Sequence, residues 1–115
     1  MTLCFALNYG SRAEILQAVK EIAVDVSNGE YDAESINEEV FANHLQTNFL
    51  GDLSEPDLMI RTSGEQRLSN FLLWQLAYSE YYFTDIFWPD FSKEDLEEAI
   101  LTYQKRQRRY GGLIS

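Results

Sequence analysis

The sequence predicts an α/β fold in which helices pack on a largely parallel sheet. Two short apolar runs, residues 3–7 and 58–60, have the length and the following turn residues that are typical of buried strands. Segments with apolar residues at helical intervals follow both runs, and this alternation is typical of an α/β layer arrangement. In such folds the functional residues are expected at the carboxyl ends of the strands.

Length and composition indicate one domain or part of one. The chain has 115 residues, of which 45% are hydrophobic and 14% aromatic, which is enough for a globular core. Nine basic residues stand against 19 acidic ones, so the net charge is -10. This balance excludes a general nucleic-acid surface, because phosphate backbones require positively charged faces. Any anion site must be local, and most of the positive charge lies at Arg61, Arg67, Lys105, Arg106, Arg108 and Arg109.

The single cysteine, Cys4, cannot form an internal disulfide. The sequence contains no basic-then-apolar signal segment and no long apolar span, so a cytoplasmic location is expected. Because Cys4 lies in the apolar run 3–7, we expect it to be a small buried residue.

The first strand, at residues 3–7, is predicted to end in the turn residues 8–10, and a helix to begin at Ser11. Ser11 and Glu14 have the spacing of a capping box. Residues 28–29, Asn-Gly, end the helical pattern. The face that packs on the sheet is predicted to contain Ile15, Val19, Ile22 and Val26.

A second helix is predicted after Asp32, with its acidic residues on a solvated face and a loop at residues 50–56. His44 lies in this helix without a cysteine, aspartate or second histidine at ligand spacing. We therefore expect His44 to be structural or exposed and assign it no chemistry. The apolar face is predicted to contain Ile36, Val40 and Leu45.

The second strand, residues 58–60, leads into a turn at residues 63–66. A third helix is predicted to be capped by Ser69. Its body, residues 71–77, is apolar on nearly all sides, which implies burial on more than one side.

The last part of the chain is predicted to contain a short strand at residues 81–84 and an aromatic loop at residues 88–91. Ser92 and Asp95 have the spacing of a capping box for the last helix, and residues 111–112, two glycines, are expected to end it. One face of this helix is predicted to contain Leu96, Ile100 and Tyr103.

The sequence predicts a site that can bind an anion, here called the anion cradle, formed by Arg61, Arg67 and Ser69. Each guanidinium group can bind two phosphate oxygens, the serine hydroxyl can donate a further contact, and the N-terminus of the predicted helix adds partial positive charge. A diphosphate fits this arrangement. The alternative is that the arginines pair with Asp57 and Glu65 while Ser69 is an ordinary helix cap.

Several segments resemble the cis-prenyltransferase family, most closely the bacterial undecaprenyl diphosphate synthases. Residues 57–80 read DLMIRTSGEQRLSNFLLWQLAYSE and resemble the long signature of the family. Residues 8–12 (NYGSR), 88–91 (WPDF) and 108–112 (RRYGG) resemble three further family segments. The resemblance covers essentially the whole chain, and the departures are Ser11 and Ser63 at positions where the family usually has glycine.

The resemblance implies roles for individual residues. Arg61, Arg67 and Ser69 match the residues that hold the diphosphate of isopentenyl diphosphate, and Glu80 matches an acidic residue of the Mg2+ site. A single carboxylate with diphosphate and water is a reasonable magnesium shell.

Two further groups are candidates for lining the active site. Asn8, Tyr9 and Arg12 are expected at a strand end, although a turn around a buried tyrosine explains them equally well. Arg109 and Gly111 resemble an Arg-x-Gly element that reaches an active site near the subunit boundary in related dimers. The alternative is that the cations only stabilise the end of the last helix.

The implied activity is the cis-condensation of isopentenyl diphosphate onto an allylic diphosphate, such as farnesyl diphosphate, to give a long polyprenyl diphosphate that serves as a cell-wall lipid carrier. The implied cofactor is Mg2+, and the implied assembly is a homodimer or a pairing with a full-length chain or an N-terminal half. A transmembrane segment is not expected, but peripheral membrane contact through the product is.

Residues 1–115 resemble only the C-terminal half of the family's catalytic domain. The N-terminal half carries the segment His-x-Met-Asp-Gly-Asn-x-Arg-Trp, including the family's essential aspartate, and no stretch of this chain replaces it. The catalytic residue is therefore unknown here, and the isolated chain is expected to be inactive. The alternative function is a noncatalytic diphosphate-binding or dimerisation module that docks on a full-length partner.

Overall fold

The computed structural model describes the backbone of residues 1–114 and the side chains of residues 1–107. The chain divides into two compact units: residues 1–54 with 68–75, and residues 55–67 with 76–115. The predicted α/β class with a parallel sheet is confirmed by two parallel strands and by the helices that precede and follow them in the chain. None of the described helices is long and apolar enough to cross a membrane.

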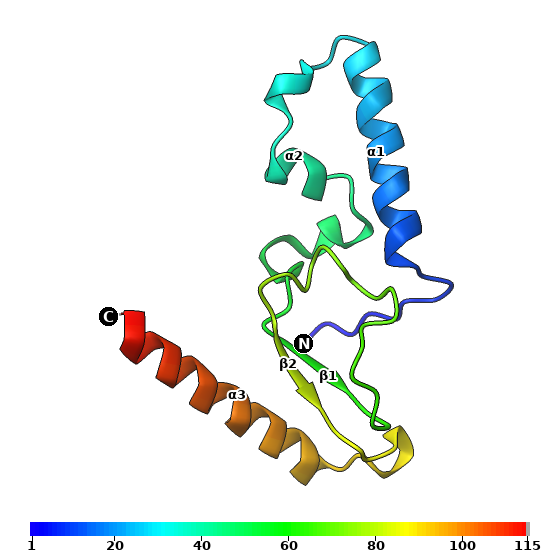
Figure 1. Ribbon diagram of the computed structural model, residues 1–115. Coiled ribbons are helices and arrows are strands. Elements are labelled where there is room, and N and C mark those ends of the chain that lie inside the picture. Colours follow the sequence, from blue (N-terminus) through cyan, green and yellow to red (C-terminus); the bar gives the residue numbers. More distant parts are fainter. Residues whose placement is uncertain (115) are drawn as a thin grey trace. The chain divides into compact units, whose positions relative to one another are not determined.

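The first unit contains one long helix and several short ones (Figure 1). Their bounds are α1 Ser11–Ser27, η1 Ala33–Ser35, α2 Glu38–Ala42 and η2 Gln46–Leu53, where η denotes a 3-10 helix. Figure 1 shows α1 as the blue helix and the cyan and green segment with α2 running back beside it.

Helix α1 has the predicted bounds, but of its predicted apolar face only Ile22 is fully buried, while Ile15 and Val26 are half-buried. It ends because Gly29 has a φ of 77°, which lets the N–H of Glu30 bind the carbonyl of Asp25 at 3.0 Å. The buried residues are Ser11, Glu14, Ala18 and Ile22, whereas Val19 is 50% exposed. The buried residues do recur at helical intervals, but two of them, Ser11 and Glu14, are polar. A pattern of hydrophobic residues cannot predict that polar residues are buried.

The strand predicted at residues 3–7 is absent. No described residue pairs with this segment, and Leu3, Phe5 and Leu7 are 73%, 79% and 82% exposed. Cys4, expected to be buried, is exposed as well. An apolar run becomes a strand only when another strand satisfies its backbone groups, and none does so here.

The single helix predicted after Asp32 is also wrong. The segment forms η1, α2 and η2 instead, and Leu45 is the residue of its predicted apolar face that is buried. Asn37 interrupts the helical pattern, because its Oδ1 accepts the N–H of Val40 at 2.9 Å and so begins α2 as a new helix. Residues 46–53, assigned to a loop in part, form η2, which is kinked at Gly51.

The second unit contains the sheet and the last helix (Figure 1). The bounds are β1 Leu58–Arg61, β2 Glu80–Phe83, η3 Trp88–Asp90 and α3 Lys93–Ile114. The strands β1 and β2 run parallel, with Leu58 opposite Glu80 and Arg61 opposite Phe83. The sequence predicted every boundary of the two strands to within one residue. In this unit Met59, Leu76 and Ala99 are the buried apolar residues.

The third predicted helix does not form. Residues 69–78 are turns, and Ser69, Asn70 and Leu72 have φ angles of 50°, 64° and 47°. A right-handed helix cannot contain such residues. Ser69 is therefore not a helix cap, and the helix N-terminus that the anion cradle was to use is not present at this position.

Helix α3 begins as predicted. Asp95 Oδ2 accepts the N–H of Ser92 at 2.8 Å, and Ser92 Oγ lies 3.3 Å from the N–H of Asp95, which is the expected capping box. Between residues 93 and 107 of the helix the buried residue is Ala99, whereas Leu96 and Ile100 are 42% and 41% exposed. The helix continues to Ile114, so the two glycines at 111–112 lie within it instead of ending it.

Candidate functional site

Arg61 is the last residue of β1 and lies at the carboxyl end of the sheet, as predicted. Backbone hydrogen bonds join the loop that follows to the residues after β2. The N–H of Ser63 donates to the carbonyl of Ile86, and that of Gly64 to the carbonyl of Thr84, both at 2.9 Å. Thr84 in turn donates to the carbonyl of Arg61 at 3.0 Å. We call residues 61–67 the arginine loop.

The tight turn of the arginine loop requires glycine at one position. Gly64 has a φ of 71°, and a Cβ there would lie 3.1 Å from Asp85 Oδ1. Ser63, which stands where the family usually has glycine, also adopts a left-handed φ of 66°. The departure at Ser63 therefore does not prevent the turn.

Glu65 holds the two arginines of this loop together. Its Oε2 lies 2.8 Å from Arg67 Nε and 3.3 Å from Arg61 Nη2. Arg61 Nη1 also donates to the backbone carbonyl of Arg67 at 2.7 Å. The alternative pairing is thus half right: Glu65 binds both guanidinium groups, while no ion pair of Asp57 occurs among the described residues.

The arginine loop keeps donors available for an anion. Arg67 uses Nε toward Glu65, and its side chain is 71% exposed. Its two terminal nitrogens have no partner among the described residues. Because one carboxylate offsets only one of two guanidinium charges, the loop can bind a second anionic group such as a phosphate.

Ser69 belongs to the first unit, where it precedes Asn70 in a left-handed turn. Asn70 accepts the first two N–H groups of α1: its carbonyl accepts Ser11 N–H at 2.8 Å, and its Oδ1 accepts Arg12 N–H at 2.8 Å. Sequence reasoning missed Asn70. The available signal was a Ser-Asn pair, since asparagine tolerates left-handed backbone and binds nearby amides.

Asn8 and Tyr9 lie beside this turn. Asn8 has a φ of 52°, and the ring of Tyr9 packs edge-on against Phe71 with centroids 5.8 Å apart. The Tyr9 hydroxyl donates to Glu14 Oε1 at 2.5 Å. Burial, reinforced by the hydrogen bond to Glu14, raises the pKa of Tyr9 to about 12. These contacts match the alternative of a turn with a packed tyrosine.

Buried polar side chains surround Tyr9. Glu14, only 2% exposed, accepts Gln46 N–H at 2.8 Å and Gln75 Nε2 at 3.2 Å in addition to the tyrosine. Ser11 is fully buried, and its Oγ accepts the N–H of Leu73 at 2.9 Å, so the expected capping box with Glu14 does not form. We call Tyr9, Ser11, Glu14 and Gln75 the α1 cluster.

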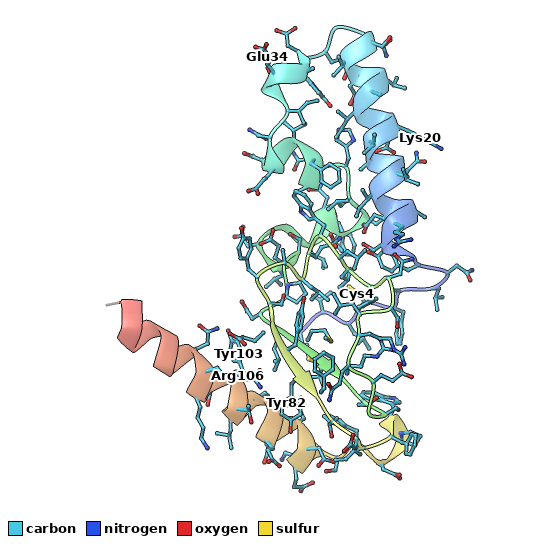
Figure 2. The ribbon with its side chains drawn as sticks, viewed as in Figure 1. Cys4, Lys20, Glu34, Tyr82, Tyr103 and Arg106 are labelled. Atoms are coloured by element: carbon cyan, nitrogen blue, oxygen red, sulfur yellow. The ribbon has the colours of Figure 1, made fainter. Side chains whose placement is uncertain are left out.

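Glu80 lies in the second unit but away from the arginine loop. It pairs across the sheet with Leu58, three residues before Arg61, so it lies about 10 Å back along the strands. The odd separation also puts Glu80 on the opposite face of the sheet from Arg61. Its Oε2 is 3.7 Å from Nη1 of Arg106, which also donates to the carbonyl of Tyr81 at 2.5 Å. Figure 2 labels Arg106 on α3.

A magnesium site requires several oxygen ligands around one point. The described residues contain no group of three or more histidine, cysteine, aspartate or glutamate side chains that could hold a metal ion. Magnesium can be held by one carboxylate together with substrate phosphates, but Glu80 is paired with Arg106 and separated from both arginines of the loop. The residues that the structure describes, as arranged, do not fit the ion. Arg109 and Gly111 lie outside the residues whose side chains are described, and their backbone is part of α3.

The structure therefore sorts the expected site residues into three groups. Arg61 and Arg67 lie together, Asn8, Tyr9, Arg12 and Ser69 lie in the first unit next to or near Asn70, and Glu80 stands apart in the second unit. The chemistry that the arginine loop can perform is the binding of a multiply charged anion.

Comparisons with known proteins show the family of the chain. Residues 1–111 match the family model described as "Putative undecaprenyl diphosphate synthase". The chain is 60% identical over 114 residues to an isoprenyl transferase of Enterococcus faecalis and 58% identical over 113 residues to one of Halalkalibacterium halodurans. These alignments cover 98% of this chain but only 42% and 43% of the relatives, so the chain spans less than half of their length.

Two solved structures are similar in fold. One is lavandulyl diphosphate synthase from Lavandula x intermedia in complex with dimethylallyl diphosphate, with a TM-score of 0.81 and 46% identity, covering 85% of this chain and 41% of that one. The other is a probable undecaprenyl diphosphate synthase from Campylobacter jejuni, with a TM-score of 0.68 and 36% identity, covering 92% and 45%. The chain belongs to the undecaprenyl diphosphate synthase family of prenyltransferases.

Proposed function

We propose that residues 1–115 are the C-terminal, isopentenyl-diphosphate-binding part of a cis-prenyltransferase. The complete enzyme would condense isopentenyl diphosphate onto an allylic diphosphate such as farnesyl diphosphate and release a long polyprenyl diphosphate. The observation that carries this proposal is the arginine loop, in which Glu65 holds Arg61 and Arg67 together. The side chain of Arg67 is largely exposed, and its terminal nitrogens have no partner among the described residues.

The loop would act by binding and orientation. Arg67 would grip the diphosphate with its terminal nitrogens, and Arg61, fixed by the Arg67 carbonyl and by Glu65, would supply the second cation. Held in this way, the double bond of isopentenyl diphosphate attacks the allylic carbon, the allylic diphosphate leaves, and loss of a proton leaves the new cis double bond. Positioning of the two reactants accounts for a large part of such a rate enhancement.

Glu65 is proposed as a positioning residue. It engages Arg67 only at Nε, so it fixes the guanidinium plane without using the fork that a phosphate would take. The exposed end of Arg67 would then bind the diphosphate with little further ordering.

Magnesium is part of the proposal for the complete enzyme, where it would neutralise diphosphate charge. Glu80 would bind the ion only after its ion pair with Arg106 is broken. The other ligands of the ion would come from the diphosphate, from water or from the rest of the complete enzyme. Ser69 as a diphosphate donor, and Asn8, Tyr9, Arg12, Arg109 and Gly111 as residues lining the active site, are proposals for the same assembly.

Homodimerisation, pairing with an N-terminal half, membrane contact through the product and a cytoplasmic location are likewise proposals for the complete enzyme. Nothing among the described residues favours the alternative of a noncatalytic docking module, and the named relatives carry the names of enzymes.

Calorimetric titration of the 115-residue chain with isopentenyl diphosphate tests the proposal. Arg67→Ala is expected to weaken binding roughly ten-fold or more, because a charge-assisted contact contributes about 1.5–3 kcal/mol. Lys93→Ala removes an exposed cation from the start of α3 and is the matched control, expected to bind as the unaltered chain does. Equal affinities for Arg67→Ala and the unaltered chain would reject the arginine loop as the site.

A condensation assay separates binding from catalysis. With isopentenyl and farnesyl diphosphates and Mg2+, the 115 residues alone are expected to bind without forming product. Product formed by the purified chain would overturn the assignment of only a binding role to these residues.

A further inference from the structure

His44 is the only histidine of the chain, and it joins α1 to the segment that runs back beside it. Its Nδ1 lies 3.1 Å from Glu21 Oε2, and its Nε2 lies 3.5 Å from Asp25 Oδ2. Glu21 and Asp25 are one helical turn apart on α1. The imidazole thus lies between two carboxylates of the same helix face.

Other polar and charged groups lie near the imidazole. The Tyr31 hydroxyl donates to Asp25 Oδ2 at 3.2 Å and lies 3.5 Å from His44 Nε2. Lys20 lines the same open groove, and Glu30 adds negative charge beside Tyr31. Histidine is the side-chain type that ordinarily gains or loses a proton between about pH 5 and 8, whereas carboxylates, amines and phenols ordinarily keep their protonation state there.

The proton count on the ring decides how many contacts His44 makes. A neutral imidazole has one N–H and one lone pair, so only one of its nitrogens can donate to a carboxylate. The other nitrogen then presents a lone pair to an acceptor, and the Tyr31 proton is already directed to Asp25. The imidazolium form donates from both nitrogens and satisfies Glu21 and Asp25 together.

The contacts around His44 also shift the pKa values of Glu21 and Tyr31. The hydrogen bond from His44 lowers the pKa of Glu21, with a smaller contribution from Gln17. Burial, followed by the charge of Asp25, raises the pKa of Tyr31, which keeps the hydroxyl proton in place for Asp25.

We propose that His44 is a pH-sensitive clamp: when protonated, it ties Glu21 and Asp25 of α1 to residues 31–45, and when neutral, it releases one of these two contacts. The segment is therefore held more firmly at pH 5.5 than at pH 8. The clamp is independent of the proposed diphosphate site, because it involves none of the residues of the arginine loop.

Hydrogen exchange on the full 115-residue chain tests the clamp. Protection factors, in which the intrinsic pH dependence of exchange is divided out, are measured at pH 5.5 and pH 8 for peptides covering residues 31–45. The protection factors of the unaltered chain are expected to be roughly two- to five-fold higher at pH 5.5 than at pH 8. This ratio corresponds to the free energy that a partly exposed ion pair contributes. His44→Gln is expected to show the same protection at both pH values.

Two further variants keep the test decisive. Glu21→Gln keeps the histidine and is expected to reduce the pH dependence by about half, whereas Glu97→Gln, on α3, is expected to leave it unchanged. Should His44→Gln fail to fold, Glu21→Gln and Asp25→Asn together replace it. A pH dependence that is absent from the unaltered chain, or one that persists in His44→Gln or in the double variant, would overturn the proposal.

Discussion

The α1 cluster and the arginine loop are both built from charged and polar side chains close to turns. They differ in the burial of the central carboxylate and in the groups that bind it. In the α1 cluster the carboxylate of Glu14 is buried and accepts three hydrogen bonds. In the arginine loop the carboxylate of Glu65 is partly exposed and is shared by two guanidinium groups. A buried acceptor with all its donors stabilises the fold, whereas an exposed cation with unused donors is suited to bind a ligand.

This contrast gives each region its own signature in experiments. Changes in the α1 cluster should alter the free energy of unfolding, and changes in the arginine loop should alter diphosphate affinity without altering stability.

The largest effect is expected from Glu14→Ala. The substitution leaves the Tyr9 hydroxyl, the Gln75 amide and the Gln46 N–H without their acceptor, so the free energy of unfolding should fall by about 3 kcal/mol in urea titrations. Glu97→Ala removes an exposed acid from α3 and should change stability by less than about 0.5 kcal/mol. Equal stabilities of the two variants would show that the α1 cluster is not structural.

Ser92→Ala is expected to cost about 1 kcal/mol of stability, because it removes the side chain that caps α3. The variant lies in the same unit as the arginine loop, and thermal unfolding measures the cost. Its affinity for isopentenyl diphosphate should stay unchanged. A loss of affinity comparable to that of Arg67→Ala would mean that stability and binding are not separable in this unit.

The Tyr9 hydroxyl links the α1 cluster to pH. Because its folded pKa is about 12 and that of an unfolded tyrosine is near 10, its contribution is complete below pH 10 and is lost as the pH rises toward 12. Tyr9 is partly exposed, so solvent screening limits the contribution to on the order of 1 kcal/mol. The stability difference between the unaltered chain and Tyr9→Phe should shrink from pH 9 to pH 12, and a constant difference would contradict the assignment.

The smallest effect is expected from Glu65→Gln. A neutral amide holds the two arginines less firmly, so affinity for isopentenyl diphosphate should fall roughly three-fold while stability stays within about 0.5 kcal/mol. Asp57→Asn is the control and should leave affinity unchanged. Tighter binding by Glu65→Gln would show that Glu65 competes with the ligand instead of positioning the arginines.

The sequence predicted the parts of the fold that depend on local signals. Strand β1, helix α1 and the capping box of α3 follow from apolar runs, turn residues and cap spacing, and the structure has all three. The arginines at the end of β1 were found for the same reason, because a strand end followed by a glycine turn is readable in the sequence.

The parts that failed depend on distant partners. Residues 3–7 have the pattern of a strand, but no described residue pairs with them. Residues 71–77 are apolar enough for a helix, yet Asn70 accepts hydrogen bonds from the start of α1, and Leu72 has a left-handed backbone. The separation of Glu80 from Arg61 follows from the strand register, which the sequence does not reveal.

The central claim, that Arg61 and Arg67 form the diphosphate site, is tested most directly by NMR of the arginine Nε–H groups. On titration with isopentenyl diphosphate, the signals of Arg61 and Arg67 should shift in parallel and saturate together, while the signal of Arg106, engaged with Glu80 and Tyr81, should stay in place. Saturable binding that leaves the Arg61 and Arg67 signals unmoved would contradict the account.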